Sequence, residues 1–213
     1  MSILVTGGSG FIGTNLVSAL VRDGHRVLIY DEERSSAHPD LCVIADVRDR
    51  DRLCDSMSGI EVVFHLAAEH LDDVHPVSLY YEVNVGGAQN LVHGMINNDV
   101  KKLIFTSTVA LYGLDADEPN EQNPARPFND YGWSKYGSET VFNEWADGDK
   151  RRALVIVRPA VIFGEKNRGN VYNLVSQIAS GKFIMIGDGK NKKSMGYVLN
   201  LVEYLKSSLK TPA

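Results

Sequence analysis

The chain alternates between short apolar runs and longer stretches in which apolar residues recur with helical spacing. The short runs, which have the length and composition of buried strands, are residues 3–6, 27–31, 41–45, 62–66, 103–107 and 153–157. The helical stretches between them are residues 11–22, 50–57, 78–97 and 131–145. Because consecutive parallel strands need crossover connections, this alternation predicts an α/β protein with a doubly wound parallel sheet and helices on both faces.

The pattern changes after Arg158. Residues 170–180 and 198–209 have helical periodicity, and residues 183–187 have the pattern of a short strand. Residues 113–130 are polar and contain three prolines, which is typical of a loop at the carboxyl end of a strand, where doubly wound sheets place their active sites. We therefore predict one domain over residues 1–165 and a remainder, residues 166–213, too short for an independent core.

Composition and charge narrow the class of protein. The chain has 213 residues, of which 44% are apolar and 23% charged, as in ordinary globular proteins. Its net charge of -5 gives no general attraction to nucleic acid or to an anionic membrane. The sequence shows no signal peptide and no apolar run of transmembrane length, so we expect a cytoplasmic protein. The basic cluster Lys190, Lys192 and Lys193 suits a diphosphate.

No metal site is expected. Cys42 and Cys54 do not make a disulfide framework or a zinc site, and His65 and His70 lack the spacing of metal ligands. His65 is interpreted as a residue at a strand end. His70 is either a surface residue or a contact to a sugar.

A glycine-rich turn joins the first predicted strand to the first helix. Gly7, Gly10 and Gly13 are spaced three apart in Thr6-Gly7-Gly8-Ser9-Gly10-Phe11-Ile12-Gly13. The first glycine permits a tight turn, the second lets the backbone approach a pyrophosphate, and the third lets helix and strand pack closely. This arrangement predicts a dinucleotide-binding site.

An acidic residue at the end of the second strand bears on which dinucleotide binds. Asp31 has close to the spacing at which a carboxylate binds the adenosine ribose hydroxyls, and it would repel a 2′-phosphate. NAD is therefore favoured over NADP, although Arg34 nearby leaves NADP open. Asp46 and Val47, just after the third strand, are expected beside the adenine.

A phenol and an ammonium group share one face of a predicted helix in Tyr131-Gly132-Trp133-Ser134-Lys135. A cation there would favour the phenolate, so Tyr131 could exchange a proton with a sugar hydroxyl near neutral pH. Lys135 could also bind the nicotinamide ribose. The hydroxyls of Thr106-Ser107-Thr108 follow a central strand and could hold the reacting oxygen against Tyr131.

Taken together, these motifs are similar to those of the extended short-chain dehydrogenase/reductase family, and within it to the NAD-dependent epimerase/dehydratase branch that includes the UDP-glucose 4-epimerases. The matching positions are residues 7–13, Asp31, Asp46-Val47, His65-Leu66-Ala67-Ala68, Asn84-Val85-Gly86-Gly87, residues 106–113, residues 131–135 and Val157-Arg158-Pro159. The resemblance implies a Rossmann fold that binds NAD, and it implies hydride transfer at C4 of a nucleotide-diphosphate sugar.

The resemblance also assigns residues to roles. The catalytic residues would be Thr108, Tyr131 and Lys135, with Ser107 as the alternative to Thr108. The cofactor would be bound by Gly7, Gly10, Phe11, Ile12, Gly13, Asp31, Asp46, Val47, Leu66, Ala67, Ala68, Asn84, Thr106, Tyr131, Lys135 and Pro159. The substrate would be bound by Thr108, Tyr131, Asn170 and Lys193. Residues 166–213 would be part of the family's substrate-binding lobe and a returning helix, most of the lobe being missing.

Some positions depart from the family pattern. Relatives that dehydrate the sugar carry an acidic pair where this chain has Val109 and Ala110, which argues against a 4,6-dehydratase and against a decarboxylase that uses a glutamate there. Val161 replaces an asparagine that often reaches the substrate, so the identity of the sugar stays open.

The leading hypothesis is a nucleotide-sugar 4-epimerase. The alternatives are an NAD(P)-dependent keto-sugar reductase or dehydrogenase with the same Thr/Tyr/Lys set, and a non-catalytic NAD-binding protein. A homodimer is expected, because helices 78–97 and 131–145 correspond to the pair that forms the dimer in relatives.

Overall fold

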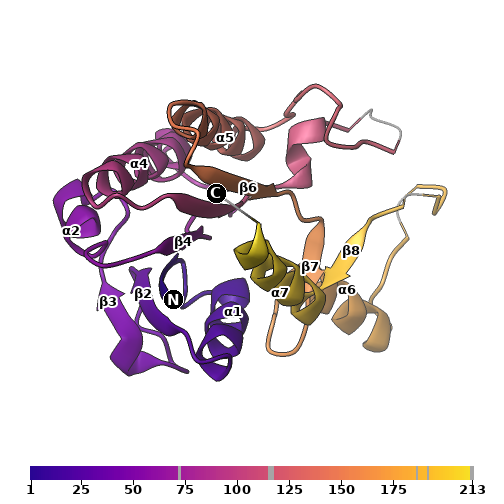
Figure 1. The fold of residues 1–213 in the computed structure, drawn as a ribbon. Helices are drawn as coiled ribbons and strands as arrows, with labels where there is room; N and C mark the ends of the chain where they lie inside the picture. The colour runs from indigo at the N-terminus through magenta and orange to yellow at the C-terminus, as the bar shows by residue number, and fades with distance from the viewer. Residues whose placement is uncertain (72, 115–117, 186, 191, 212–213) are drawn as a thin grey trace.

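The computed structural model describes residues 1–71, 73–114, 118–185, 187–190 and 192–211. Its central sheet has six parallel strands in the order β3-β2-β1-β4-β5-β6 (Figure 1). The strands are β1 (Ser2–Thr6), β2 (Arg26–Asp31), β3 (Cys42–Ile44), β4 (Val62–His65), β5 (Lys102–Thr106) and β6 (Ala153–Val157). The direction of winding reverses between β1 and β4, as in dinucleotide-binding folds. The predicted doubly wound parallel sheet is confirmed.

Helices cover both faces of this sheet (Figure 1). One face carries α1 (Phe11–Arg22) and α7 (Val198–Ser207), and the other carries α2 (Arg50–Asp55), α4 (Gly87–Asn97) and α5 (Asp130–Asp147). Successive side chains of β1 point to opposite faces: Ile3 and Val5 enter the core beneath α1, whereas Leu4 enters the core beneath α4. Because both faces are buried, the strands read as continuous apolar runs rather than alternating ones.

The predicted helix at residues 78–97 is interrupted. It consists of α3 (Ser78–Tyr80), a π-helical segment η2 (Tyr81–Gly86) and α4. A π-helical turn inserts an extra residue per turn and often marks a functional site. Here it contains Asn84, a buried asparagine whose side chain bonds to two neighbouring segments.

Short 3-10 turns complete the connections. They are η1 (Pro39–Leu41) before β3, η3 (Val109–Tyr112) after β5 and η4 (Ser208–Lys210) after α7. Leu41 belongs to the first of these turns rather than to β3, because Pro39 begins a tight turn there. Within the described ranges, no helix combines the length and the apolarity needed to cross a bilayer.

Beyond β6 the chain leaves the sheet and returns. β7 (Val161–Phe163) and β8 (Met195–Tyr197) form a separate parallel pair, and α6 (Asn170–Ala179) lies between them in sequence (Figure 1). α7 then packs on α1, where Val198, Val202 and Leu205 are buried in the main core. This tail therefore contributes a helix to the main core.

The strand predicted at residues 183–187 is wrong over its described part. Residues 183–185 have no regular secondary structure, and Ile186 lies outside the described residues. Phe183, Ile184 and Met185 are exposed, so this apolar run does not enter a sheet. The small sheet forms instead from β7 and β8, each too short to show a strand period in the sequence.

Candidate active site

A cleft of about 720 Å³ opens at the carboxyl ends of the parallel strands. It contains most of the residues predicted to bind cofactor or substrate: Gly7, Gly10, Phe11, Ile12, Gly13, Asp31, Val47, Leu66, Ala67, Ala68, Thr106, Thr108, Tyr131, Lys135 and Pro159. The carboxyl ends of β2 and β5, the segments that follow β1, β3, β4, β5 and β6, and the first turns of α5 supply these residues. Their convergence follows from the fold, because parallel strands bring all their carboxyl ends to one edge.

The glycine turn has the geometry that a pyrophosphate requires. Gly7 has a φ of +70°, and a Cβ there would lie 2.6 Å from the Ala67 nitrogen. A Cβ on Gly13 would lie 2.1 Å from the Gly7 carbonyl oxygen, so a side chain would separate the turn from the helix. Gly10 is the N-cap of α1, and no side chain caps that helix. The first amides of α1 are therefore available to an anion in the cleft.

The Asp31 carboxylate is held at the end of β2 by backbone amides. Its Oδ2 accepts a hydrogen bond from Ser9 N at 2.9 Å, and its Oδ1 accepts one from Glu33 N at 3.0 Å. Each oxygen keeps a further lone pair that can accept from a ribose hydroxyl. Asp31 lines the cleft, whereas Arg34 is exposed.

The cleft wall after β3 includes a cation that the sequence analysis missed. Arg48 lines the cleft, and its Nε donates to Asp46 Oδ2 at 2.7 Å. Burial raises the pKa of Asp46, but the hydrogen bonds from Arg48 outweigh it and the pKa of Asp46 is lowered. The pKa of Glu32 is raised, mainly by burial and further by its contact with Asp46. Val47 lines the cleft as predicted, while Asp46 holds Arg48 from behind.

Tyr131, Thr108 and Lys135 meet at the other end of the cleft. Tyr131 lies in the first turn of α5, which is capped by Asn129 accepting from Gly132 N at 2.9 Å. Burial raises the pKa of Tyr131, and a hydrogen bond with the Thr108 side chain acts in the opposite direction. Thr108 also caps η3, where its Oγ1 accepts from Ala110 N at 3.1 Å.

Lys135 is directed at the strand rather than at the phenol. Its Nζ donates to the Thr106 carbonyl oxygen at 2.7 Å and lies 4.2 Å from the centre of the Phe105 ring. Burial lowers the pKa of Lys135 to about 7, against the opposing charge of Glu139. The expectation that Lys135 lowers the pKa of Tyr131 is therefore wrong for this arrangement, because burial dominates and the pKa of Tyr131 is raised.

Two hydroxyls in the cleft are buried without a partner. Thr106 Oγ1 and Ser107 Oγ make no hydrogen bond to any described residue, although both residues line the cleft. A buried polar atom without a partner costs free energy, so these hydroxyls suit a polar ligand. With the glycine turn and Asp31 they make the residues of the cleft fit NAD.

Asn84 lies behind the cleft rather than in its lining. Its Oδ1 accepts from Glu69 N at 2.8 Å, and its Nδ2 donates to Ser134 Oγ at 2.8 Å. It also accepts at its backbone oxygen from Ser138 Oγ at 2.9 Å. Asn84 thus ties the loop after β4 to α5. Its predicted contact with the cofactor becomes a positioning role.

A partly buried ion pair supports the same helix. Arg158 donates to both carboxylate oxygens of Glu139, at 2.9 and 2.6 Å, and to the Tyr112 hydroxyl at 2.9 Å. Glu139 is one turn beyond Lys135 on α5, and its charge raises the pKa of Lys135. Arg158 therefore connects the strand before Pro159 with the helix and the loop that carry Tyr131 and Thr108.

The predicted substrate residues of the tail are not in the cleft. Asn170, at the start of α6, and Lys193, before β8, are both exposed and outside the cleft lining. Asn167 lines the cleft instead, three positions earlier. His70 lines the cleft and is exposed, so both interpretations of that histidine stay open. Ser107 and Ala160, neighbours of predicted residues, complete this end.

The fold and the cleft define a dinucleotide-binding protein of the Rossmann type with a tyrosine, a lysine and a threonine together at one end of the cleft. The model of the NAD dependent epimerase/dehydratase family matches residues 3–213, and the chain belongs to this family. The predicted family and the predicted cofactor, NAD, are thereby confirmed.

Similar proteins include several sugar epimerases. The chain is 49% identical over its whole length to the N-acetyl-alpha-D-glucosaminyl-diphospho-ditrans,octacis-undecaprenol 4-epimerase of Escherichia coli O157:H7, of which it covers 64%. It is 31% identical to the UDP-glucose 4-epimerase of Vibrio cholerae, with 99% of this chain and 67% of that one covered. The chain thus spans about two thirds of the length of these relatives.

Solved structures share the fold. The UDP-glucose 4-epimerase of Thermus thermophilus in complex with NAD superposes with a TM-score of 0.88 at 25% identity, covering 99% of this chain and 75% of the other. The UDP-N-acetylglucosamine 4-epimerase of Methanobrevibacter ruminantium M1, in complex with UDP-N-acetylmuramic acid, has a TM-score of 0.84 at 28% identity, covering 99% and 73%. The roles of individual site residues stay predictions.

Proposed function

We propose that the protein is an NAD-dependent 4-epimerase that inverts C4 of a sugar joined to a diphosphate. The observation that carries this proposal is the convergence of Thr108, Tyr131 and Lys135 on one cleft with the glycine turn and Asp31. The similarity to named 4-epimerases supports it. Residues 1–165 would bind the cofactor, and residues 166–213 would supply part of the substrate lobe and the returning helix α7.

In this proposal Tyr131 removes the proton from the C4 hydroxyl and later returns it. The nicotinamide, when bound, supplies the chemistry of accepting a hydride from C4 and giving it back. Thr108 holds the reacting oxygen against the phenol, since both side chains line the same end of the cleft and, against the effect of burial, Thr108 lowers the pKa of Tyr131. Lys135, anchored on the Thr106 carbonyl, holds the ribose of the cofactor beside Tyr131. The 4-keto sugar rotates and is then reduced on its other face. Because the hydride is returned to the sugar, no net redox change occurs.

The group beyond the diphosphate distinguishes two substrate classes. A nucleoside is the prediction from the sequence, and it agrees with the names of several of the similar epimerases. A polyprenol is the second candidate, favoured by the name of the 49% identical relative. We also propose a cytoplasmic homodimer joined through α4 and α5, where Ile96, Trp133 and Tyr136 expose apolar surface.

The experiment is direct. The protein is incubated with NAD and, in separate samples, UDP-glucose, UDP-N-acetylglucosamine and a polyprenyl-diphosphate N-acetylglucosamine, and the 4-epimers are sought by proton NMR. Epimer formation with NAD that is lost in Tyr131→Phe is the expected result. Net oxidation or reduction of the sugar without an epimer would favour the keto-sugar reductase. Cofactor binding with no turnover of any of these substrates would contradict the epimerase proposal.

A further inference from the structure

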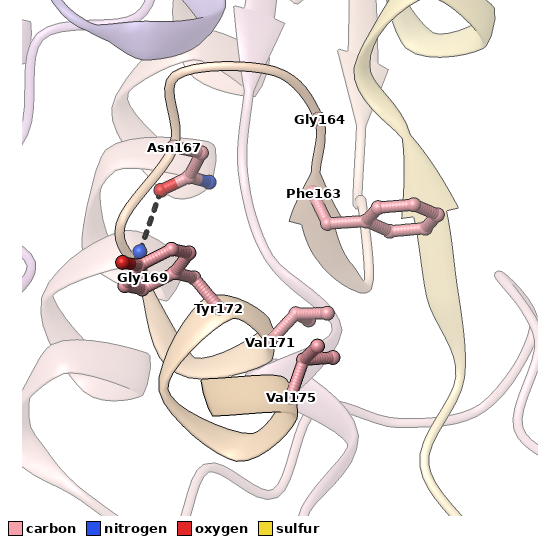
Figure 2. Close-up of a pocket in the computed structure, with 7 residues that line it drawn as sticks. All are labelled: Phe163, Gly164, Asn167, Gly169, Val171, Tyr172 and Val175. Carbon is pink, nitrogen blue, oxygen red and sulfur yellow. Dashed lines mark hydrogen bonds between the residues drawn. The ribbon is translucent and has the colours of Figure 1, made fainter. Parts of the chain in front are cut away.

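A second, smaller cavity adjoins the cleft. It has a volume of about 210 Å³ and is lined by Phe163, Gly164, Asn167, Gly169, Val171, Tyr172 and Val175 (Figure 2). Asn167 lines both this small pocket and the cleft, so the two adjoin at this residue. A group attached to a sugar in the cleft would extend toward it.

Several polar groups of the small pocket hold its own loop, while the Tyr172 hydroxyl makes no hydrogen bond to a described residue. Asn167 Oδ1 accepts from Gly169 N at 2.8 Å, the contact drawn in Figure 2, and its Nδ2 donates to the Ile162 carbonyl at 3.2 Å. The carbonyl of Gly164 accepts from Asn167 N, and that of Gly169 accepts from Asn173 N. The pocket thus offers few free donors and acceptors of the kind that read the edge of a nucleobase.

What the pocket does offer is hydrocarbon. Val171 and Val175 project from the same side of α6, one turn apart, with Phe163 at the end of β7 (Figure 2). None of the residues of α6 is buried. Exposed apolar side chains follow along and beyond this helix: Ile178 near the end of α6 and Phe183, Ile184 and Met185 after it are all more than 45% exposed. Exposed apolar side chains in this number are typical of a surface that binds an apolar partner.

Positive charge accompanies this apolar surface. The connection between β7 and β8, residues 164–194, has six basic and two acidic side chains, a net charge of +4, whereas the whole chain carries -5. Lys190, Lys192 and Lys193 come just before β8, whose first residue pairs with Val161. Val161 follows directly on Pro159 and Ala160 of the cleft. The lysines therefore come just before the end of the β7–β8 sheet that is next to the cleft. A diphosphate that joins a sugar in the cleft to a group in the small pocket would lie at this end.

We propose that the small pocket binds the first isoprenoid units of a polyprenyl diphosphate sugar, with the lysines before β8 neutralising the diphosphate. This inference rests on the proposed function and assigns it one of the two substrate classes. A volume of 210 Å³ is below the roughly 300–1,000 Å³ of pockets that bury a whole drug-sized ligand. Only the first units of the chain would enter, and the remainder would run over the exposed apolar residues of α6 and residues 183–185.

The test uses farnesyl diphosphate, a short soluble polyprenyl diphosphate, as the probe. Its binding is measured by titration calorimetry beside that of UDP and inorganic diphosphate, so the contribution of the apolar group is separated from that of the charge. Val175→Asn places a polar side chain in the pocket on an already exposed position. Leu199→Asn on α7, equally exposed and outside the pocket, is the matched control.

We expect farnesyl diphosphate to bind more tightly than UDP or inorganic diphosphate. Val175→Asn should weaken farnesyl diphosphate binding by about 10-fold, the usual effect of losing most of a valine contact, and Leu199→Asn should leave it unchanged. Tighter binding of UDP, itself weakened by Val175→Asn, would overturn the inference in favour of a nucleobase. Equal losses in both variants would overturn it as non-specific adsorption. Because the readout is binding, these outcomes are independent of whether the epimerase assay succeeds.

Discussion

The side-chain nitrogen of Lys135 and the carbonyl oxygen of Thr106 are 2.7 Å apart, so the lysine of the active site is tied to the last residue of β5. The bond satisfies one donor of a buried ammonium group. The Lys135 nitrogen also lies 4.2 Å from the centre of the Phe105 ring, which covers it. Burial nevertheless lowers the pKa of Lys135 to about 7. The protonation state of this lysine thus changes near neutral pH, where the proposed reaction occurs.

The first prediction concerns the stability that follows from this burial. Because the folded-state pKa of Lys135, about 7, is below its ordinary 10.5, the unfolded protein binds the extra proton between these values. The free energy of unfolding should therefore rise with pH over this window, by up to about 1.4 kcal/mol per unit. In Lys135→Met the rise should be absent, as urea unfolding at pH 7, 8 and 9 would show. Lys150→Met, at an exposed turn, should keep the wild-type slope; the same slope in all three proteins would refute the assignment.

The second prediction concerns Tyr131. Tyr131→Phe should fold normally and bind NAD, because the glycine turn and Asp31 are untouched. Epimerase turnover should fall by roughly 10²–10⁴-fold, the usual contribution of general acid–base catalysis. Thr108→Ala should cost less, since it removes an orienting hydrogen bond rather than the proton acceptor. Steady-state kinetics decide the order, and a Tyr131→Phe enzyme as active as the wild type would reject the mechanism.

The third prediction concerns His65, which is completely buried and hydrogen-bonded to Thr6 Oγ1 at 2.7 Å. Burial, helped by the charge of Lys135, lowers the pKa of His65 to about 3. Between pH 6.5 and 3 the unfolded state binds the extra proton, so stability should fall as the pH drops through this window. The loss should be about 2 kcal/mol between about pH 6.5 and about pH 5. His65→Gln, whatever its stability at pH 7, should show a correspondingly smaller dependence in urea unfolding; an unchanged acid slope would contradict the assignment.

The fourth prediction concerns cofactor choice. The wild-type protein should bind NAD more tightly than NADP, because the Asp31 carboxylate repels a 2′-phosphate. Asp31→Asn should weaken NAD binding by roughly 10–100-fold, the range for a lost hydrogen bond to a charged group. The same substitution should weaken NADP binding less, so the difference between the affinities for NAD and NADP should become smaller. Titration calorimetry with both cofactors measures this, and a wild-type preference for NADP would count against the role of Asp31.

The fifth prediction concerns Lys193. Lys193→Ala should weaken the binding of inorganic diphosphate several-fold at low salt, with the difference shrinking at high salt because exposed charges are screened. Lys150→Ala, an equally exposed lysine in the turn before β6, is the control and should have no effect. If both variants bound diphosphate like the wild type, Lys193 would not belong to the substrate site.

The sheet and the cofactor end of the cleft could be predicted because local signals specify them. Gly7, Gly10 and Gly13 are required by backbone geometry, and Asp31 follows from strand spacing, so their convergence needed no tertiary information. The strands could be recognised in the sequence because both faces of the sheet are buried, which makes each strand a continuous apolar run. These are features that a single segment of sequence carries.

The remainder depends on contacts between distant segments. The extent of residues 78–97 was predicted, but their π-helical interruption was not, because it accompanies hydrogen bonds of Asn84 to Glu69 and Ser134. The apolar run at residues 183–185 has strand-like composition, yet no neighbouring strand pairs with it within the described residues. The pKa of Tyr131 could not be inferred from its spacing to Lys135, because the lysine bonds to Thr106 and burial dominates.

The parallel pairing of β7 with β8 has a consequence for how this family could diversify. Val161 lies opposite Met195 and Phe163 opposite Tyr197, so the 31 residues of 164–194 leave and rejoin the core at neighbouring points. This segment is therefore attached to the core through the paired strands β7 and β8. The packing of α7 on α1 involves no residue of this segment, so on the proposed function its sequence can change, and with it the choice of sugar carrier, while the cofactor fold is kept. Exchanging this segment between epimerases should then change the substrate.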